Sequence, residues 1–329
     1  MKAVIWTKYG SPDGLQLGEM ETPSPKEKEV LIKIHAATAS RADTEFRRLK
    51  LPFLFAIPVR LYLGLLKPSR IKILGSEFAG EVIAVGKDVT QYQTGDQVYG
   101  YTGLGMGTYA EYICLAEKPS GLLSVMSKRP TNITYEEAAA VPFGGLEALH
   151  SLDRVNIQRG QKVLIVGAGG SIGTYSVQLA KHYGAEVTGV DSAGKLDMLR
   201  SIGADHVIDY KQEDYTKNRQ KYDVIMDTIG GSPFAGSVRS LSENGTYLNV
   251  NPKMIHRLQM ALNKGIRSKR LLSWEGSYST KNLLRLKELV EAGVIKPVID
   301  RRYPLEEIVE AHRYVETDEK KGNVVIVIA

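Results

Sequence analysis

Cysteine is nearly absent from this sequence. Its 329 residues include a single cysteine, Cys114, so no disulfide can form within the chain. A cysteine-rich zinc lobe needs several thiolates and is excluded for the same reason. The fold must therefore be held together by its own core, for which this length and a hydrophobic content of 43% are sufficient.

No hydrophobic run in the sequence is long enough to cross a membrane. A transmembrane helix needs roughly 20 consecutive apolar residues. The most apolar stretch, residues 49–66, is shorter and is interrupted by Lys50, Pro52, Pro58 and Arg60. We expect a packed loop or a short helix there. An apolar flap over a substrate and a contact with a membrane surface are the alternatives.

The chain also lacks a strong excess of one charge. Its net charge is +6, and no basic tail or nucleic-acid-binding motif accompanies it, so nucleic acid is not an expected partner. Basic residues concentrate at 253–274, where no acidic residue stands before Glu275. We expect an exposed basic helix there, with an anionic membrane surface as the alternative partner. Residues 2–6 predict a strand and not a signal peptide, which makes a cytoplasmic location the expectation.

The middle of the chain contains a strand, a glycine cluster, a helix and a second strand. Residues 163–166 are aliphatic, as in a parallel strand that is covered on both faces. After four glycines a helix is predicted over 174–183, and Gly184 suits a left-handed turn at its C-terminus. Residues 186–190 predict the second strand, which Asp191 ends. This order is typical of a βαβ unit that binds a dinucleotide.

The glycine turn of this unit has alanine in place of the first glycine of the usual motif. It reads Ala-x-Gly-x-x-Gly. Glycines let the backbone approach a pyrophosphate without a Cβ in the way, and the N-terminus of the following helix attracts anions. The predicted cofactor-binding residues of the turn are Ala168, Gly169, Gly170, Ser171, Ile172 and Gly173.

Different patterns flank this unit on its two sides. Strands predicted at 205–210, 222–227 and 245–250 continue the βα alternation, which implies a parallel sheet with right-handed crossovers. Residues 2–114 instead predict strands of a glycine-turned, largely antiparallel unit. A final strand predicted at 323–329 suggests that the C-terminal part returns to complete this first domain.

Together these segments resemble the medium-chain dehydrogenase/reductase superfamily, in its zinc-free quinone oxidoreductase-like branch. The resemblance implies an α/β fold, in which a doubly wound parallel Rossmann sheet (residues 123–268) joins a GroES-like, mainly antiparallel β domain (residues 1–122 and 269–329). It also implies a homodimer that transfers hydride from a reduced nicotinamide to a quinone, enone or aldehyde. The segments that carry the resemblance are 75–86, 95–96, 107–112, 142–148, 168–173, 203–210 and 320–325.

The same resemblance implies that zinc is absent. In zinc-dependent relatives a histidine follows the glycine that is Gly75 here, whereas this chain has Ser76, a poor zinc ligand. No cysteine lies near Ser40 or Phe143, where the other ligands are expected. Without a Lewis acid the enzyme is poorly equipped to ionise a simple alcohol. It is better suited to an acceptor that is already electrophilic.

The candidate catalytic residues also come from the resemblance. Ser40 aligns with a family position that faces the nicotinamide, and Asp43 aligns with a position usually filled by Asp. The alternative role for Asp43 is to cap the short helix that follows. Tyr101 is a candidate hydrogen-bond donor in the cleft, with simple packing as its alternative role. Water is the alternative source of the proton.

The residues after the second strand leave the choice of cofactor open. Asp191 favours NAD(H), because an acid there binds the ribose 2′-hydroxyl and repels a 2′-phosphate. Ser192 and Lys195 match positions that hold the 2′-phosphate in NADPH-using relatives, and Tyr210 matches a position that flanks it. The resemblance therefore slightly favours NADP(H). The other residues that we assign to the cofactor site are Asn249 and Asn323.

One residue and one alternative function are not accounted for by this interpretation. Glu147 stands where relatives commonly have threonine, and a carboxylate close to the cofactor is costly unless it is paired. A backbone group or an arginine is its expected partner. The alternative function is a nicotinamide-binding redox sensor, or a membrane-surface protein that uses residues 49–66 and 253–274, with little catalytic activity.

Overall fold

Contacts between residues divide the chain into two units. The computed structural model describes residues 1–49, 53–118, 124–262, 268–275 and 278–328. Unit 1 consists of Met1–Phe143, Tyr278–Glu291 and Ile299–Ala329. Unit 2 consists of Gly144–Ser277 and Ala292–Val298.

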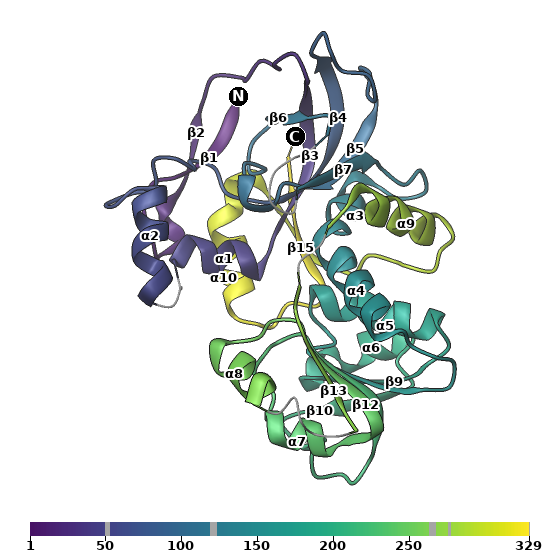
Figure 1. Ribbon diagram of the computed structural model, residues 1–329. Coiled ribbons are helices and arrows are strands. Elements are labelled where there is room, and N and C mark those ends of the chain that lie inside the picture. Colours follow the sequence, from purple (N-terminus) through teal and green to yellow (C-terminus); the bar gives the residue numbers. More distant parts are fainter. Residues whose placement is uncertain (50–52, 119–123, 263–267, 276–277, 329) are drawn as a thin grey trace. The chain divides into compact units, whose positions relative to one another are not determined.

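Unit 1 is built on a seven-stranded, mainly antiparallel sheet (Figure 1). Its long strand β3 (Glu29–Ala39) pairs with three others, including β15 (Asn323–Val327), which confirms that the C-terminal strand returns to the first domain. A separate two-stranded sheet contains β1 (Lys2–Trp6) and β2 (Leu15–Glu19). The other strands of the large sheet are β14 (Ile299–Pro304), β4 (Glu77–Val85), β5 (Gln97–Tyr101), β6 (Tyr112–Ala116) and β7 (Val125–Lys128).

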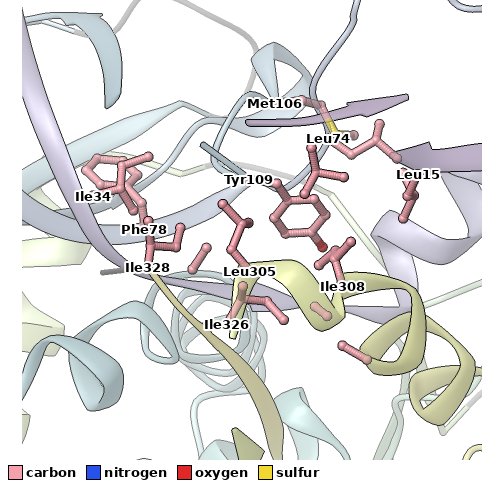
Figure 2. Packing of buried hydrophobic residues seen from close by; sticks show 14 of the residues in the cluster. Leu15, Ile34, Leu74, Phe78, Met106, Tyr109, Leu305, Ile308, Ile326 and Ile328 are labelled. Carbon is pink, nitrogen blue, oxygen red and sulfur yellow. The ribbon is translucent and has the colours of Figure 1, made fainter. Parts of the chain in front are cut away.

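Helix α10 (Ile308–Glu316) packs against this sheet and closes the core of unit 1. Inward-facing residues of the strands meet apolar residues of α10 and of the turn before it. Figure 2 shows the ring of Tyr109 among Leu74, Leu305 and Ile308. The other described helices of this unit are α1 (Arg41–Arg48), α2 (Phe53–Leu63), α3 (Tyr135–Ala139) and α9 (Thr280–Glu291).

Unit 2 carries a six-stranded sheet in which all strands are parallel. The spatial order is β10, β9, β8, β11, β12, β13, which is the order of a dinucleotide-binding sheet. The predicted fold class is therefore confirmed. The strands are β8 (Lys162–Val166), β9 (Glu186–Asp191), β10 (His206–Asp209), β11 (Tyr222–Asp227), β12 (Leu241–Asn249) and β13 (Arg270–Ser273). The helices are α4 (Pro142–Val155), α5 (Ser171–His182), α6 (Leu196–Ser201), α7 (Phe234–Arg239) and α8 (Met254–Leu262).

The division by contacts differs from the domain bounds that the resemblance implies. Residues 124–143 lie in unit 1, because β7 pairs with β5 and α3 packs against β3 and β4. Residues 278–291 also belong there, since α9 packs against β7. Helix α4 begins at Pro142, so one helix continues from unit 1 into unit 2.

The apolar stretch (residues 49–66) and the basic stretch (residues 253–274) each contain secondary-structure elements that are shorter than the stretch itself. Within residues 49–66, the helix α2 has 11 residues. In the part of the chain that the structure describes, no helix is long and apolar enough to cross a bilayer. Within 253–274, α8 ends at Leu262 and Arg270–Ser273 form a strand, because β12 offers a parallel partner. The prediction of one basic helix over this stretch was therefore wrong for Arg270–Ser273, and residues 263–267 lie outside the described residues.

Candidate functional site

The glycine turn joins β8 to α5 in unit 2, as the sequence predicts. Gly170 is the N-cap of α5 and provides no side-chain cap. A Cβ on Gly173 would lie 2.3 Å from the carbonyl oxygen of Gly167, so only glycine allows the helix to pack this closely on the turn. The N–H groups in the first turn of a helix have no preceding helical carbonyl to bond. The start of α5 is thus built to receive an anion.

This turn lies at the carboxyl edge of the parallel sheet, where the strand order reverses between β8 and β11. Val166 lies beside both Val190 and Asp227, and Asp227 lies beside Asn249. In open α/β sheets, ligands bind outside the carboxyl ends of the strands at this point. The predicted residue Asn249 is fully buried at that edge, where its side-chain oxygen accepts a hydrogen bond from the N–H of Asn251.

Asp227 is a residue of this edge that the sequence reasoning missed. It is fully buried, and its carboxylate accepts hydrogen bonds from the N–H groups of Ile229, Gly230 and Ser232 and from the hydroxyl of Tyr247. These four bonds compensate for the burial of its charge. They also fix the loop that follows β11 next to the glycine turn. The available signal was an acid at the end of a predicted strand, which is also how Asp191 was found.

Asp191 is turned toward the glycine turn. Its carboxylate accepts hydrogen bonds from the N–H groups of Gly169 and Ser192, each at 2.8 Å. The ammonium group of Lys195 lies 3.2 Å from Oδ1, the oxygen that also accepts the N–H of Ser192. Both side chains of this pair are buried. The acid that favours NAD(H) in the sequence is thus neutralised by the lysine that favours NADP(H).

The remaining predicted cofactor residues divide between the two units. Ser192 follows β9 directly, and the N–H of Tyr210 donates to the carbonyl of Asp191, so these residues lie at one end of the sheet. The ring of Tyr210 is 56% exposed. Asn323 is buried at the start of β15 and belongs to unit 1. The residues of unit 2 fit a dinucleotide: a glycine cradle, an uncapped helix N-terminus, and polar side chains at the end of the second strand.

Glu147 has a defined partner in unit 2. It is buried on α4, and one carboxylate oxygen accepts a hydrogen bond of 2.7 Å from the indole N–H of Trp274. One partner is therefore a tryptophan side chain, which is neither of the two groups expected from the sequence. The indole N–H is a single neutral donor, so it compensates only in part for the burial of the carboxylate.

In unit 1, two serines converge on one buried carboxylate. The hydroxyl groups of Ser40 and Ser76 donate to the two oxygens of Asp43, at 2.5 Å and 3.4 Å. Ser40 is also the N-cap of α1, and its hydroxyl oxygen accepts the N–H of Asp43. The carboxylate of Asp43 in turn accepts the N–H of Ser40, which confirms the predicted capping role. Burial raises the pKa of Asp43 to about 6, against the opposing effect of these hydrogen bonds.

Glu77 lies next to this cluster and was missed from the sequence. One oxygen accepts a hydrogen bond from the hydroxyl of Thr38, and the other accepts the N–H of Phe143 at 2.8 Å, close to the start of α4. The side chain is completely enclosed, and this burial raises its pKa to about 8. Glu77 is therefore largely protonated at neutral pH. Its position directly after Ser76 was the only sequence signal, and burial cannot be read from adjacency.

A tyrosine and a histidine complete the cluster. The hydroxyl of Tyr109 donates to the carbonyl of Thr38 and lies 3.1 Å from Nε2 of His312. Burial lowers the pKa of His312 to about 3 and raises that of Tyr109 well above its usual value. Both groups are therefore neutral across the physiological range. Their role in this network is to fix the backbone of β3 beside Asp43.

Tyr101, the third candidate catalytic residue, lies opposite Glu77 in the β4–β5 strand pair. It is largely buried at the end of β5, and its ring packs against Phe143 and Tyr278 at centroid distances of 5.5 and 5.7 Å. Cys114 lies on β6 opposite Leu31, towards the other end of β3. Among the described residues, no group of three His, Cys, Asp or Glu side chains is arranged to hold a metal ion.

Comparisons with known proteins place the whole chain in one family. The family model of the alcohol dehydrogenase GroES-like domain matches residues 26–124, and that of zinc-binding dehydrogenases matches residues 202–326. The chain is 32% identical to the 2-methylene-furan-3-one reductase of Solanum lycopersicum, over 99% of this chain and 79% of that protein. It is 30% identical to the chloroplastic NADPH-dependent alkenal/one oxidoreductase of Arabidopsis thaliana, with the same coverage of 99% and 79%.

The solved structures agree with the sequence relatives. The quinone oxidoreductase from Coxiella burnetii superimposes with a TM-score of 0.87 at 29% identity, over 100% of this chain and 99% of that one. The relatives are named as reductases or oxidoreductases, and the Arabidopsis thaliana protein is named as NADPH-dependent. The protein is therefore an NAD(P)H oxidoreductase, and the chain belongs to the medium-chain dehydrogenase/reductase superfamily, in its quinone oxidoreductase-like branch.

Proposed function

We propose that this oxidoreductase reduces quinones or α,β-unsaturated carbonyl compounds without a zinc ion. The observation that carries the proposal is that Ser40 and Ser76, at the expected metal positions, both donate hydrogen bonds to Asp43. Hydroxyl groups are weak zinc ligands beside thiolates and imidazoles. A reaction without a Lewis acid favours an acceptor that is already electrophilic. The relatives named as furanone, alkenal/one and quinone reductases support these substrate classes.

Different residues of the chain bind the cofactor, bind the acceptor and position these groups. In unit 2 the start of α5 and the glycine turn would hold the pyrophosphate, and Asp227 fixes the adjacent loop. The nicotinamide, when bound, supplies the hydride. In unit 1, Tyr101 is the candidate donor to the acceptor oxygen, and Ser40 is the candidate group that faces the nicotinamide. Asp43 is a positioning residue, because its carboxylate orients the hydroxyl of Ser40.

NADPH is the proposed cofactor. The carboxylate of Asp191 already accepts two backbone N–H groups and pairs with Lys195, so its charge is compensated. A phosphate at the ribose 2′-position then meets an ammonium group instead of an uncompensated carboxylate. The relative named as NADPH-dependent supports the same choice.

A turnover screen tests this function. The purified protein is supplied with NADPH or NADH together with benzoquinone or methyl vinyl ketone. In a separate assay of the reverse direction it is supplied with NADP⁺ and a primary alcohol. We expect oxidation of NADPH by the quinone or the enone at a rate that a zinc chelator leaves unchanged, and no oxidation of the alcohol. Loss of activity with the chelator and its recovery on adding zinc would contradict the zinc-free proposal. Faster turnover with NADH would contradict the cofactor proposal.

The oligomeric state is a separate proposal. We propose the homodimer that the family resemblance implies, and light scattering coupled to size-exclusion chromatography measures it directly. A monomer mass at micromolar concentration would contradict it.

A further inference from the structure

The end of α2 and the turn after it expose large apolar side chains on unit 1. Tyr62, Leu61 and Ile57 are more than half exposed, Leu65 is 60% exposed and Leu66 is 88% exposed. We call these five residues the apolar cap. Single exposed leucines are ordinary on a protein surface. Five within ten consecutive residues are a local concentration of exposed apolar side chains, of the kind that marks an interaction site.

The apolar cap is held in place by a built turn. The carbonyl of Leu63, which is buried, accepts the N–H groups of Ser69 and Arg70. The hydroxyl of Tyr9 donates to the carbonyl of Gly64, and the guanidinium of Arg60 donates to the carbonyl of Leu65. These bonds anchor both sides of the turn while Leu65 and Leu66 point outward. Their exposure is thus a property of the fold.

Basic residues flank the apolar cap in the sequence. No acidic residue occurs from Phe46 to Ser76, and the segment carries seven lysines and arginines, of which Arg47 and Arg48 pair with Glu316. Lys67, Arg70 and Lys72 are exposed. No ion pair joins these three to a carboxylate among the described residues. The guanidinium of Arg70 lies 4.1 Å from the centre of the Tyr62 ring, so positive charge and apolar surface are in direct contact.

The combination of exposed apolar side chains and basic charges favours one of three possible binding partners: a second copy of the chain, an apolar substrate or a membrane. A second copy of the chain seated symmetrically on the patch would bring two sets of basic side chains together, and like charges oppose such an interface. A flap over an apolar substrate would need the leucines but not the surrounding charges. A bilayer with anionic phospholipid satisfies both features, because apolar side chains enter the boundary of the acyl chains while lysine and arginine meet the phosphates.

We propose that the apolar cap and the basic side chains around it dock this enzyme on the surface of membranes that contain anionic phospholipid. Docking is peripheral, because α2 has 11 residues and lies far below the length needed to span. Affinity comes from a small apolar area together with attraction to anionic headgroups. Binding is therefore reversible, and its affinity falls as salt screens the charges.

Flotation of the full-length protein with lipid vesicles tests the proposal. The probes are vesicles of phosphatidylcholine alone and of phosphatidylcholine mixed with phosphatidylglycerol, each at low and at high salt. We expect the protein to float with the mixed vesicles at low salt and to remain below in the other three conditions. The variants Leu61→Ser/Leu66→Ser and Lys67→Glu/Lys72→Glu should each lower the bound fraction roughly tenfold or more.

Matched variants keep the test specific. Leu284→Ser removes a leucine that is 44% exposed on α9, and Lys28→Glu/Lys118→Glu reverses two exposed lysines elsewhere on unit 1. Both should float like the unmodified protein, and all variants should keep the same NADPH-oxidation rate in the absence of lipid.

Four results would overturn the proposal. The first is no flotation of the unmodified protein, and the second is undiminished flotation of the Leu61→Ser/Leu66→Ser and Lys67→Glu/Lys72→Glu variants. The third is a change from dimer to monomer in the Leu61→Ser/Leu66→Ser variant without any effect of lipid, which would assign the apolar cap to a second copy. A reduced turnover without lipid in the same variant, with flotation unchanged, would assign it to the substrate.

Discussion

Glu77 provides the sharpest test of the structure, because its burial makes the stability of unit 1 depend on pH. In the folded protein its pKa is raised from 4.5 to about 8, chiefly by burial. In the unfolded chain the same carboxyl ionises near 4.5. Below that pH both states hold the proton and the group has no effect. Above it the unfolded state releases the proton and the folded state does not, so stability falls as pH rises towards 8.

The size of this effect follows from the two pKa values. One unit corresponds to about 1.4 kcal/mol, so the full difference costs at most about 5 kcal/mol and the interval from pH 5 to pH 8 accounts for about 4 kcal/mol of it. For a protein of this length, a change of 4 kcal/mol moves the unfolding temperature by about 6 °C. Asp43 adds a smaller loss of the same sign between pH 4 and 6, because its pKa is raised to about 6 by burial.

The variant Glu77→Gln should remove this dependence. Its amide oxygen can accept the N–H of Phe143, and its amide nitrogen can donate to the hydroxyl oxygen of Thr38, so both contacts of the carboxyl are retained. We therefore expect the variant to match the unmodified protein at pH 5 and to exceed its unfolding temperature at pH 8. The readout is the thermal unfolding of the full-length protein, followed by calorimetry across this interval.

The control is Glu81→Gln on the same strand, which replaces a half-exposed carboxylate. It should leave the pH dependence of unfolding as it is in the unmodified protein. If Glu77→Gln loses stability between pH 5 and pH 8 as steeply as the unmodified protein, the assignment of a protonated Glu77 is refuted.

Three further predictions concern unit 2. Gly173→Ala should weaken NADPH binding by roughly tenfold or more, because the added Cβ must displace the glycine turn. The control is Gly194→Ala, whose Cβ would meet nothing within 4 Å. Equal affinities of the two variants for NADPH in a fluorescence titration would contradict the prediction. Lys195→Ala should raise the KM for NADPH by roughly 10- to 100-fold, as expected for one charge-assisted hydrogen bond, and an equal rise for NADH would show that the lysine does not read the 2′-phosphate. Asp227→Asn should lower the free energy of unfolding by about 1–3 kcal/mol, since an amide nitrogen cannot accept the bonds from Ser232 and Tyr247. Chemical denaturation measures this free energy, and an unchanged value would refute the role of these bonds.

The sequence alone determined the parts of this protein whose contacts are local. The βαβ unit closes within about thirty residues, so its strands, its glycine turn and Asp191 follow from the order of residue types. The capping of α1 by Ser40 and Asp43 is equally local, since the two residues are three apart. The return of β15 to β3 was predictable for a different reason: an aliphatic strand needs a sheet, and the family resemblance named one.

Only the tertiary structure decided the protonation and the partners of the buried acids. Glu77 is enclosed by β3, β4 and the start of α4, and it is this enclosure that raises its pKa. Glu147 bonds to Trp274, 127 residues away, and Asp191 proved to be compensated by Lys195. In each case the charge of a carboxyl depends on how much water surrounding elements exclude and on which donors they bring near. Neither quantity is a property of the neighbouring sequence, which is why the fold could be predicted and the electrostatics of the site could not.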